Sequence, residues 1–173
     1  MTALLDPPLT AEDHVVGDPG APYELVMYGD FECPYCAAAQ GIIARVRSRL
    51  GDELRFAFRH FPIVELHPHA EQAAEAAEAA AAQGAFWEMH DALYAGRGHL
   101  TDRDLVNHAR SIGIDADRVG TELAAHVHAE RVQRDLRGGR AAGVAGTPGF
   151  FVNGALYTDV YDAGSLVAAL RGG

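Results

Sequence analysis

The sequence predicts an α/β fold in which one open sheet is built from two parts of the chain separated by a helical insert. Three observations predict it: a strand–helix–strand pattern near the start, a long stretch of helical periodicity in the middle, and a hairpin signal followed by one helix at the end. With 173 residues, 49% of them hydrophobic, the chain can bury a core without disulfide support. We divide it into residues 1–62, 63–145 and 146–173, with the middle range as the insert.

The first range is expected to hold a short edge strand, two main strands and one helix. "DHVVG" fits the edge strand, and "YELVMYGD" (residues 23–30) changes from alternation to an apolar run, as a buried strand does. Apolar residues recur at helical spacing through residues 37–50, and "LRFAFRHF" (residues 54–61) has the aromatic content of a second strand. Two strands joined through a helix should be parallel, with a right-handed crossover.

Helical patterns fill the middle range. Glu71, Glu75 and Glu78 recur at helical spacing among alanines, which predicts a helix over residues 67–83 with a solvated acidic face. Thr101 is the predicted N-cap of a later helix, ahead of Asp104. The further helices are predicted over residues 85–94, 101–111, 115–125 and 126–142, with glycines 138 and 139 as a weak point or kink in the last.

The last range predicts a hairpin and a helix. "GFFVNG" and "ALYTD" flank Asn153-Gly154, the strongest short-range hairpin signal. A terminal helix is predicted over residues 163–170. The sheet is therefore expected to be completed by strands that lie more than eighty residues beyond its first part.

The charge of the chain argues against several classes of partner. A formal net charge of −10, from 24 acidic and 14 basic residues, disfavours nucleic acid and anionic membranes. The opening "MTALLDPPLTAEDH" lacks the basic start and apolar run of a secretion signal, and no later segment reads as a membrane span. We therefore expect a soluble, cytoplasmic protein.

The two cysteines, Cys33 and Cys36, lie in "FECPYC" where the first strand gives way to a helix. A disulfide across so short a loop stabilises a fold little. With Cys33 as N-cap and Pro34 as first helical residue, free N–H groups and the helix dipole would stabilise a thiolate. Cys36, three residues on, can attack a mixed disulfide at Cys33. This "CPYC" motif predicts a redox-active centre with Cys33 exposed and reactive and Cys36 buried.

Two further features accompany the cysteines. "GTPGFF" places Thr147-Pro148 before a strand, a weak signal alone because only about 5–6% of X–Pro bonds are cis. Asp30 and Glu32 precede Cys33, and one of them is a candidate proton acceptor for the second cysteine. A solvated loop carboxylate is the equal alternative.

The sequence resembles the thioredoxin superfamily in the order of its elements and in the motifs "FECPYC" and "GTPGFFVNG". Its helical insert resembles that of the DsbA-like branch. "FRHFP", "HPHAEQAAEAA" and "FWEMHDALY" add to the resemblance, which extends from about Asp13 onward. It implies a thioredoxin fold with a helical insert, catalysing thiol-disulfide exchange without a bound cofactor. It also implies Cys33 as nucleophile, Cys36 as resolving thiol, Pro148 as a cis-proline, and Thr147 as a backbone partner for an extended substrate peptide.

The dipeptide between the cysteines predicts the direction of exchange. It is Pro-Tyr, whereas the best-known strong oxidases of the branch have Pro-His. Tyr35 should stabilise the thiolate less, so we expect a potential between those of DsbA and thioredoxin, and a reductase or isomerase. The expected partners are protein or small-molecule thiols and disulfides, with glutathione as a candidate.

Two alternatives stay open. The cysteines can instead ligate a metal or an iron–sulfur cluster in a carrier module, although the sequence has no second CxxC and no histidine at ligand spacing from them. The histidines considered as further ligands are His60, His67, His69 and His90. The aromatic residues of "FWEMHDALY", Trp87 among them, are interpreted as core, with a peptide-binding surface as the alternative.

Overall fold

The computed structural model describes residues 3–172 and has a five-stranded sheet in the order β1-β3-β2-β4-β5. The strands are β1 (His14–Val16), β2 (Tyr23–Gly29), β3 (Leu54–His60), β4 (Gly149–Val152) and β5 (Ala155–Tyr157). Only β2 and β3 pair in parallel; β1–β3, β2–β4 and β4–β5 are antiparallel. The predicted α/β class is confirmed.

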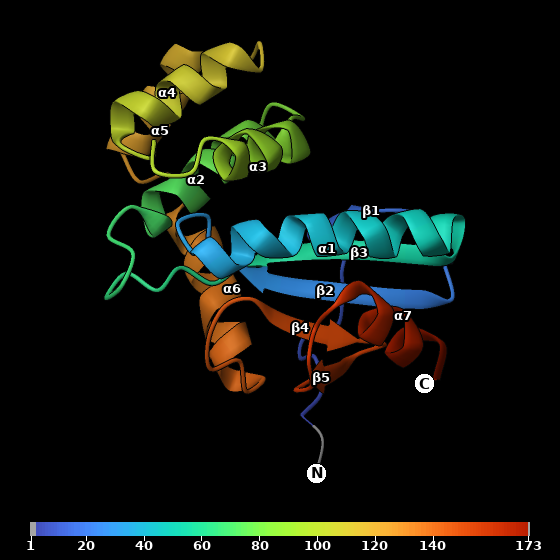
Figure 1. Cartoon of the computed structure of the whole chain (residues 1–173). Coiled ribbons are helices and arrows are strands. Elements are labelled where there is room, and N and C mark those ends of the chain that lie inside the picture. Colours follow the sequence, from blue (N-terminus) through green and yellow to red (C-terminus); the bar gives the residue numbers. More distant parts are fainter. Residues whose placement is uncertain (1–2, 173) are drawn as a thin grey trace.

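The helix α1 (Pro34–Leu50) connects β2 to β3 and lies alongside both strands in Figure 1. Its buried residues include Ile43, Val46 and Leu50, spaced by three and four residues, so one stripe faces the sheet. Because successive side chains of β2 point to opposite faces, Leu25 joins the core beneath α1, and Val26 joins a second core on the other face.

The C-terminal part forms the predicted hairpin. Asn153 and Gly154, with φ of 48° and 81°, turn β4 into β5, as a two-residue loop with left-handed backbone requires. The helix α7 (Ala163–Gly172) then packs against α1 on the same face of the sheet.

Helices make up the elements between β3 and β4. They are α2 (Ala70–Ala81), α3 (Phe86–Ala95), α4 (Asp102–Ser111), α5 (Ala116–Ala124) and α6 (Ala129–Ala141). In Figure 1, α3 lies above the left half of α1, α4 and α5 lie farther from the sheet, and α6 runs back past the arrowhead of β2. The predicted cap of α4 is confirmed as a capping box, in which the Thr101 side chain accepts from the Asp104 N–H and the Asp104 carboxylate accepts from Thr101.

The aromatic residues of α3 belong to the main core. Phe86 and Tyr94 are buried, and both of their rings lie near the ring of Phe58 on β3. Trp87 is partly buried and packs on Phe56 of the same strand. The insert is therefore joined to the sheet by α3, and the interpretation of these residues as core is confirmed.

The acidic face predicted for α2 is not solvated. Glu75 is 1% and Glu78 6% exposed, because α3, α5 and α6 pack around α2 and cover it on several sides. The small alanine side chains let these neighbours approach closely. Both carboxylates receive hydrogen-bonding partners from elsewhere in the fold, His126 for Glu75 and His60 for Glu78.

The predicted weak point at Gly138 and Gly139 is also not seen, because α6 continues through both residues. A Cβ at position 139 would lie 2.8 Å from ring carbons of both Tyr28 and Phe61. Glycine here lets the helix approach the sheet closely.

Candidate active site

Both cysteines lie at the start of α1, beside the end of β2. Cys33 is the N-cap, with extended backbone angles of φ −71° and ψ 122°, and Pro34 occupies the first helical turn. The Cys33 N–H donates to the Asp30 carbonyl at 3.2 Å, which closes the loop ahead of the helix. The expected N-cap geometry is thus present.

The Thr147–Pro148 loop covers the first cysteine. The Thr147–Pro148 peptide bond is cis, and the Cys33 Sγ lies 3.5 Å from the Thr147 carbonyl oxygen. Cys33 is only 3% exposed, and Cys36 is 0% exposed. The expectation of an exposed Cys33 is wrong, since a loop from the other end of the sequence packs over its sulfur. Tyr35, 67% exposed, is the accessible residue of the motif.

The two thiols nevertheless differ in acidity. The hydrogen bond from Cys36, together with contacts from the Thr147 side chain and the backbone of Cys36 and Tyr35, lowers the pKa of Cys33 to about 5 despite burial. Burial, and then the neighbouring Cys33, raise the pKa of Cys36. At neutral pH the pair therefore holds one thiolate, on Cys33, and one thiol, on Cys36.

Thr147 contributes a second polar group to this contact. Its hydroxyl is buried and makes no hydrogen bond to another group of the part of the chain that the structure describes. The hydroxyl is therefore free to donate to the thiolate of Cys33, whose pKa the Thr147 side chain helps lower. Sequence analysis had assigned only the backbone of Thr147 a role.

Asp30 is buried, at 1% exposed, so the solvated alternative does not hold for it. Its Oδ2 accepts from the Ile63 N–H at 2.9 Å and lies 2.8 Å from His67 Nδ1. Its Oδ1 accepts from the Glu32 N–H at 2.8 Å. The carboxylate thus fixes the loop before the cysteines to the chain that leaves β3.

Glu32 makes a similar connection. Its Oε2 accepts from the N–H of His69, the N-cap of α2, at 2.7 Å. Both acidic side chains therefore have partners in the insert, and proton acceptance from Cys36 by either one stays a prediction.

Tyr94 on α3 is a site residue that sequence analysis interpreted only as core. Its side chain is buried, and its hydroxyl donates to the Asp30 carbonyl at 3.4 Å. Helical spacing places Tyr94 on the buried face of α3 but carries no information about where the hydroxyl points. No signal in the sequence could have found this contact.

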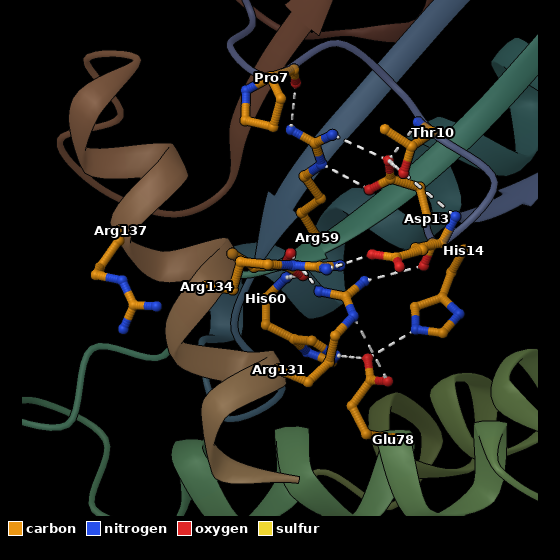
Figure 2. A network of polar contacts seen from close by, with 12 residues as sticks. Pro7, Thr10, Asp13, His14, Arg59, His60, Glu78, Arg131, Arg134 and Arg137 are labelled. Atoms are coloured by element: carbon orange, nitrogen blue, oxygen red, sulfur yellow. Dashed lines mark hydrogen bonds and ion pairs between the residues drawn. The ribbon is translucent and has the colours of Figure 1, made fainter.

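The cluster of potential metal ligands lies elsewhere. Within residues 3–172, the group of at least three ligand atoms close enough to share an ion is His14, His60 and Glu78, which includes neither cysteine. Figure 2 shows Glu78 between the two histidines. Each histidine Nε2 lies 2.7 Å from Glu78 Oε1, and Arg131 Nε lies 3.9 Å from Oε2. The arginine charge opposes a cation there, so we interpret the cluster as a polar link between sheet and insert.

Residues 9–171 match the sequence model of the family described as thioredoxin. The chain belongs to the thioredoxin family.

None of the helices in residues 3–172 combines the length and apolar character needed to cross a membrane.

Solved structures share the fold of this thioredoxin-family chain. A thioredoxin-like oxidoreductase from Silicibacter pomeroyi is 26% identical, with a TM-score of 0.83 over 94% of this chain and 92% of that one. BdbD from Bacillus subtilis, at 22% identity, shares the fold with a TM-score of 0.80 over 92% and 93% of the two chains. The α-DsbA2 thiol-disulfide exchange protein of Wolbachia pipientis, at 21% identity, has the same fold, with a TM-score of 0.78 over 94% of this chain and 87% of that one.

A curated relative extends well beyond the thioredoxin-family region. A protein of Salinispora arenicola named Na(+)/H(+) antiporter NhaA 1 is 46% identical over 160 residues, which make up 91% of this chain and 24% of the antiporter. The chain thus spans about a quarter of the length of the curated relatives it matches. Their name describes a whole protein much longer than the matched region.

Proposed function

We propose that the chain exchanges disulfides with protein or small-molecule thiols through Cys33 and Cys36, working as a reductase or isomerase. The observation that carries the proposal is the seating of Cys33 at the N-cap of α1, with its sulfur against the Thr147–Pro148 loop and Cys36 beside it. This places one stabilised thiolate next to one buried thiol, the arrangement that two-step exchange requires.

The first step is attack by the Cys33 thiolate on one sulfur of a substrate disulfide. The substrate S–S bond breaks, a mixed disulfide forms on Cys33, and the leaving thiolate takes a proton from solvent. In the second step Cys36 loses its proton and attacks the Cys33 sulfur, which releases the second substrate thiolate to be protonated. Two electrons pass from the dithiol to the substrate, and a Cys33–Cys36 disulfide remains.

A substrate must reach a sulfur that is almost fully covered. An extended peptide that pairs with the Thr147 backbone would lie within a few ångströms of Cys33, because the Thr147 carbonyl already touches that sulfur. Exposed Tyr35 offers an apolar contact beside the same place. We therefore propose that binding along Thr147 and the first attack are coupled.

The acidity of Cys33 supports this direction of exchange. A pKa of about 5 lies between about 7 for thioredoxin and about 3.5 for DsbA. Because a stabilised thiolate favours the dithiol form, the potential should lie between about −270 and −120 mV. We propose a cytoplasmic setting, where a glutathione poise of about −220 to −320 mV keeps such a pair largely reduced and able to donate electrons.

Equilibration with glutathione buffers, followed by acid trapping, tests this proposal. The expected result is an intermediate potential together with reduction of insulin. A potential as high as that of DsbA, with no insulin reduction, would show an oxidase instead. Metal analysis of freshly purified protein, with thiols counted before and after denaturation, separates exchange from the carrier alternative, which requires stoichiometric metal and blocked thiols.

A further inference from the structure

The side chain of Tyr94 links the helical insert to the redox loop, by which we mean residues 30–33 between β2 and α1. Its hydroxyl donates to the Asp30 carbonyl oxygen, the same oxygen that accepts the Cys33 N–H. Its ring packs on Phe31, with ring centroids 4.9 Å apart. The phenol is thus held by contacts on its ring and on its oxygen, and one backbone carbonyl joins it to the N-cap of α1.

The Cys36 side chain is a second neighbour that acts on the Tyr94 hydroxyl, through its charge and through a hydrogen bond. Cys36 is 0% exposed. Burial, and then the charges and hydrogen bonds of nearby groups including Cys36 and Asp30, raise the pKa of Tyr94 well above its usual range. The phenol therefore keeps its proton throughout the pH range of exchange and remains a hydrogen-bond donor.

The resolving step needs such a donor. Burial raises the pKa of Cys36, so its thiolate is costly to form, yet that thiolate must attack the mixed disulfide. The Asp30 carboxylate cannot serve as donor, because it is an acceptor for Ile63, Glu32 and His67. A neutral phenol can stabilise the thiolate without adding a charge to the interior.

We propose that the Tyr94 hydroxyl turns from the Asp30 carbonyl to the Cys36 sulfur when Cys36 becomes the thiolate that resolves the mixed disulfide. This inference rests on the exchange function proposed above. No bond is made or broken at Tyr94. The Cys36 proton leaves to solvent and is balanced by protonation of the departing substrate thiolate, while the phenol O–H remains intact.

The test measures the two steps separately in one reaction. Reduced full-length protein is mixed with excess dithionitrobenzoate, a small disulfide that releases a coloured thiol once when Cys33 attacks and again when Cys36 resolves. Tyr94→Phe keeps the ring and removes the hydroxyl. The second phase should slow by about 10-fold or more, the effect of losing one hydrogen bond to a charged group, and the first phase should be unchanged. The pH at which the second phase reaches half its maximal rate should rise.

Tyr161→Phe is the matched control. Tyr161 is a second phenol near both cysteines, and its ring packs on Phe150. Its replacement should leave both phases unchanged. An unaltered second phase in Tyr94→Phe, or equal slowing of both phases, overturns the inference. Both phases come from the same folded molecules, so a lower Tm alone does not change their ratio.

A second measurement needs no change at Tyr94. Replacing Cys36 with Ser should shift the ultraviolet titration of the highest-titrating phenol to lower pH, because the neighbouring thiolate no longer opposes phenolate formation. Absence of this shift contradicts the contact. If wild-type protein fails to exchange disulfides with any probe, the proposed function fails. If it exchanges them and Tyr94→Phe behaves like wild type, only the role of Tyr94 fails.

Discussion

The sulfur of Cys33 lies 3.5 Å from the carbonyl oxygen of Thr147, although the two residues are 114 positions apart in the sequence. β4 runs antiparallel to β2. The residues just before β4 therefore meet the residues just after β2, where these two strands end. The contact buries the sulfur and brings it to the Thr147 residue, whose side chain helps lower the pKa of Cys33. Four predictions follow from this site and from the packing that supports it.

The first prediction separates the roles of the two cysteines. Cys36→Ser should accumulate a mixed disulfide with a substrate disulfide, because nothing resolves the adduct on Cys33. Cys33→Ser should not accumulate one, since the pKa of Cys36 is raised and its sulfur is fully buried. Non-reducing electrophoresis and mass spectrometry after acid quenching measure the adduct. Adduct formation in Cys33→Ser at the rate of Cys36→Ser would reverse the assignment.

The second prediction concerns the pH dependence of Cys33. Its alkylation rate should rise with pH around a midpoint of about 5, the pKa of the thiol, and then level off because only the thiolate reacts. Thr147→Val removes the hydroxyl and keeps the shape of the side chain. It should move the midpoint upward by on the order of one unit, the effect of losing one hydrogen bond to a charge. Iodoacetamide labelling with peptide mapping measures both profiles; coincident profiles would show that the hydroxyl has no such role.

The third prediction tests the polar link at Glu78. Burial alone would raise the pKa of Glu78, but hydrogen bonds from His14 and His60 lower it. A depressed carboxyl pKa adds stability that is present above the unfolded value of 4.5 and is lost as pH falls below it. Glu78→Gln removes the carboxylate charge from this buried cluster. It should reduce the unfolding free energy by about 3 kcal/mol near neutral pH.

The difference between wild type and Glu78→Gln should shrink as the pH falls below the unfolded value, because the wild-type carboxylate then loses its advantage. Urea unfolding at several pH values measures it. A constant difference across the range would mean that charge at position 78 is not what stabilises the link.

The fourth prediction compares neighbouring glycines of α6. Gly139→Ala should destabilise the protein by about 1–3 kcal/mol, because its Cβ would lie 2.8 Å from ring carbons of Tyr28 and Phe61. Gly138→Ala is the control: the nearest atom would be 3.8 Å away, and alanine favours a helix by about 0.5–1 kcal/mol. Thermal unfolding of the two variants should therefore shift in opposite directions. Similar shifts would contradict the close approach of α6 to the sheet.

Local signals in the sequence determined most of the fold and the position of the cysteines within it. Asn153-Gly154 predicts its turn because the backbone there must be left-handed, and Thr101 with Asp104 predicts its cap from a reciprocal hydrogen bond. Cys33 at the N-cap of α1 follows in the same way, from a strand pattern that stops and a proline that begins a helix. These features depend on residues a few positions apart, so they can be read without the rest of the chain.

The tertiary structure alone decided which groups are buried and what they contact. Cys33 is covered because the chain returns with Thr147 after the whole insert, and Glu78 is enclosed because helices pack around α2 on several sides. The Tyr94 hydroxyl meets the redox loop only because α3 docks on the same core as β2 and β3. Periodicity states which side of an element is apolar, but burial and acidity depend on the distant segment that packs there.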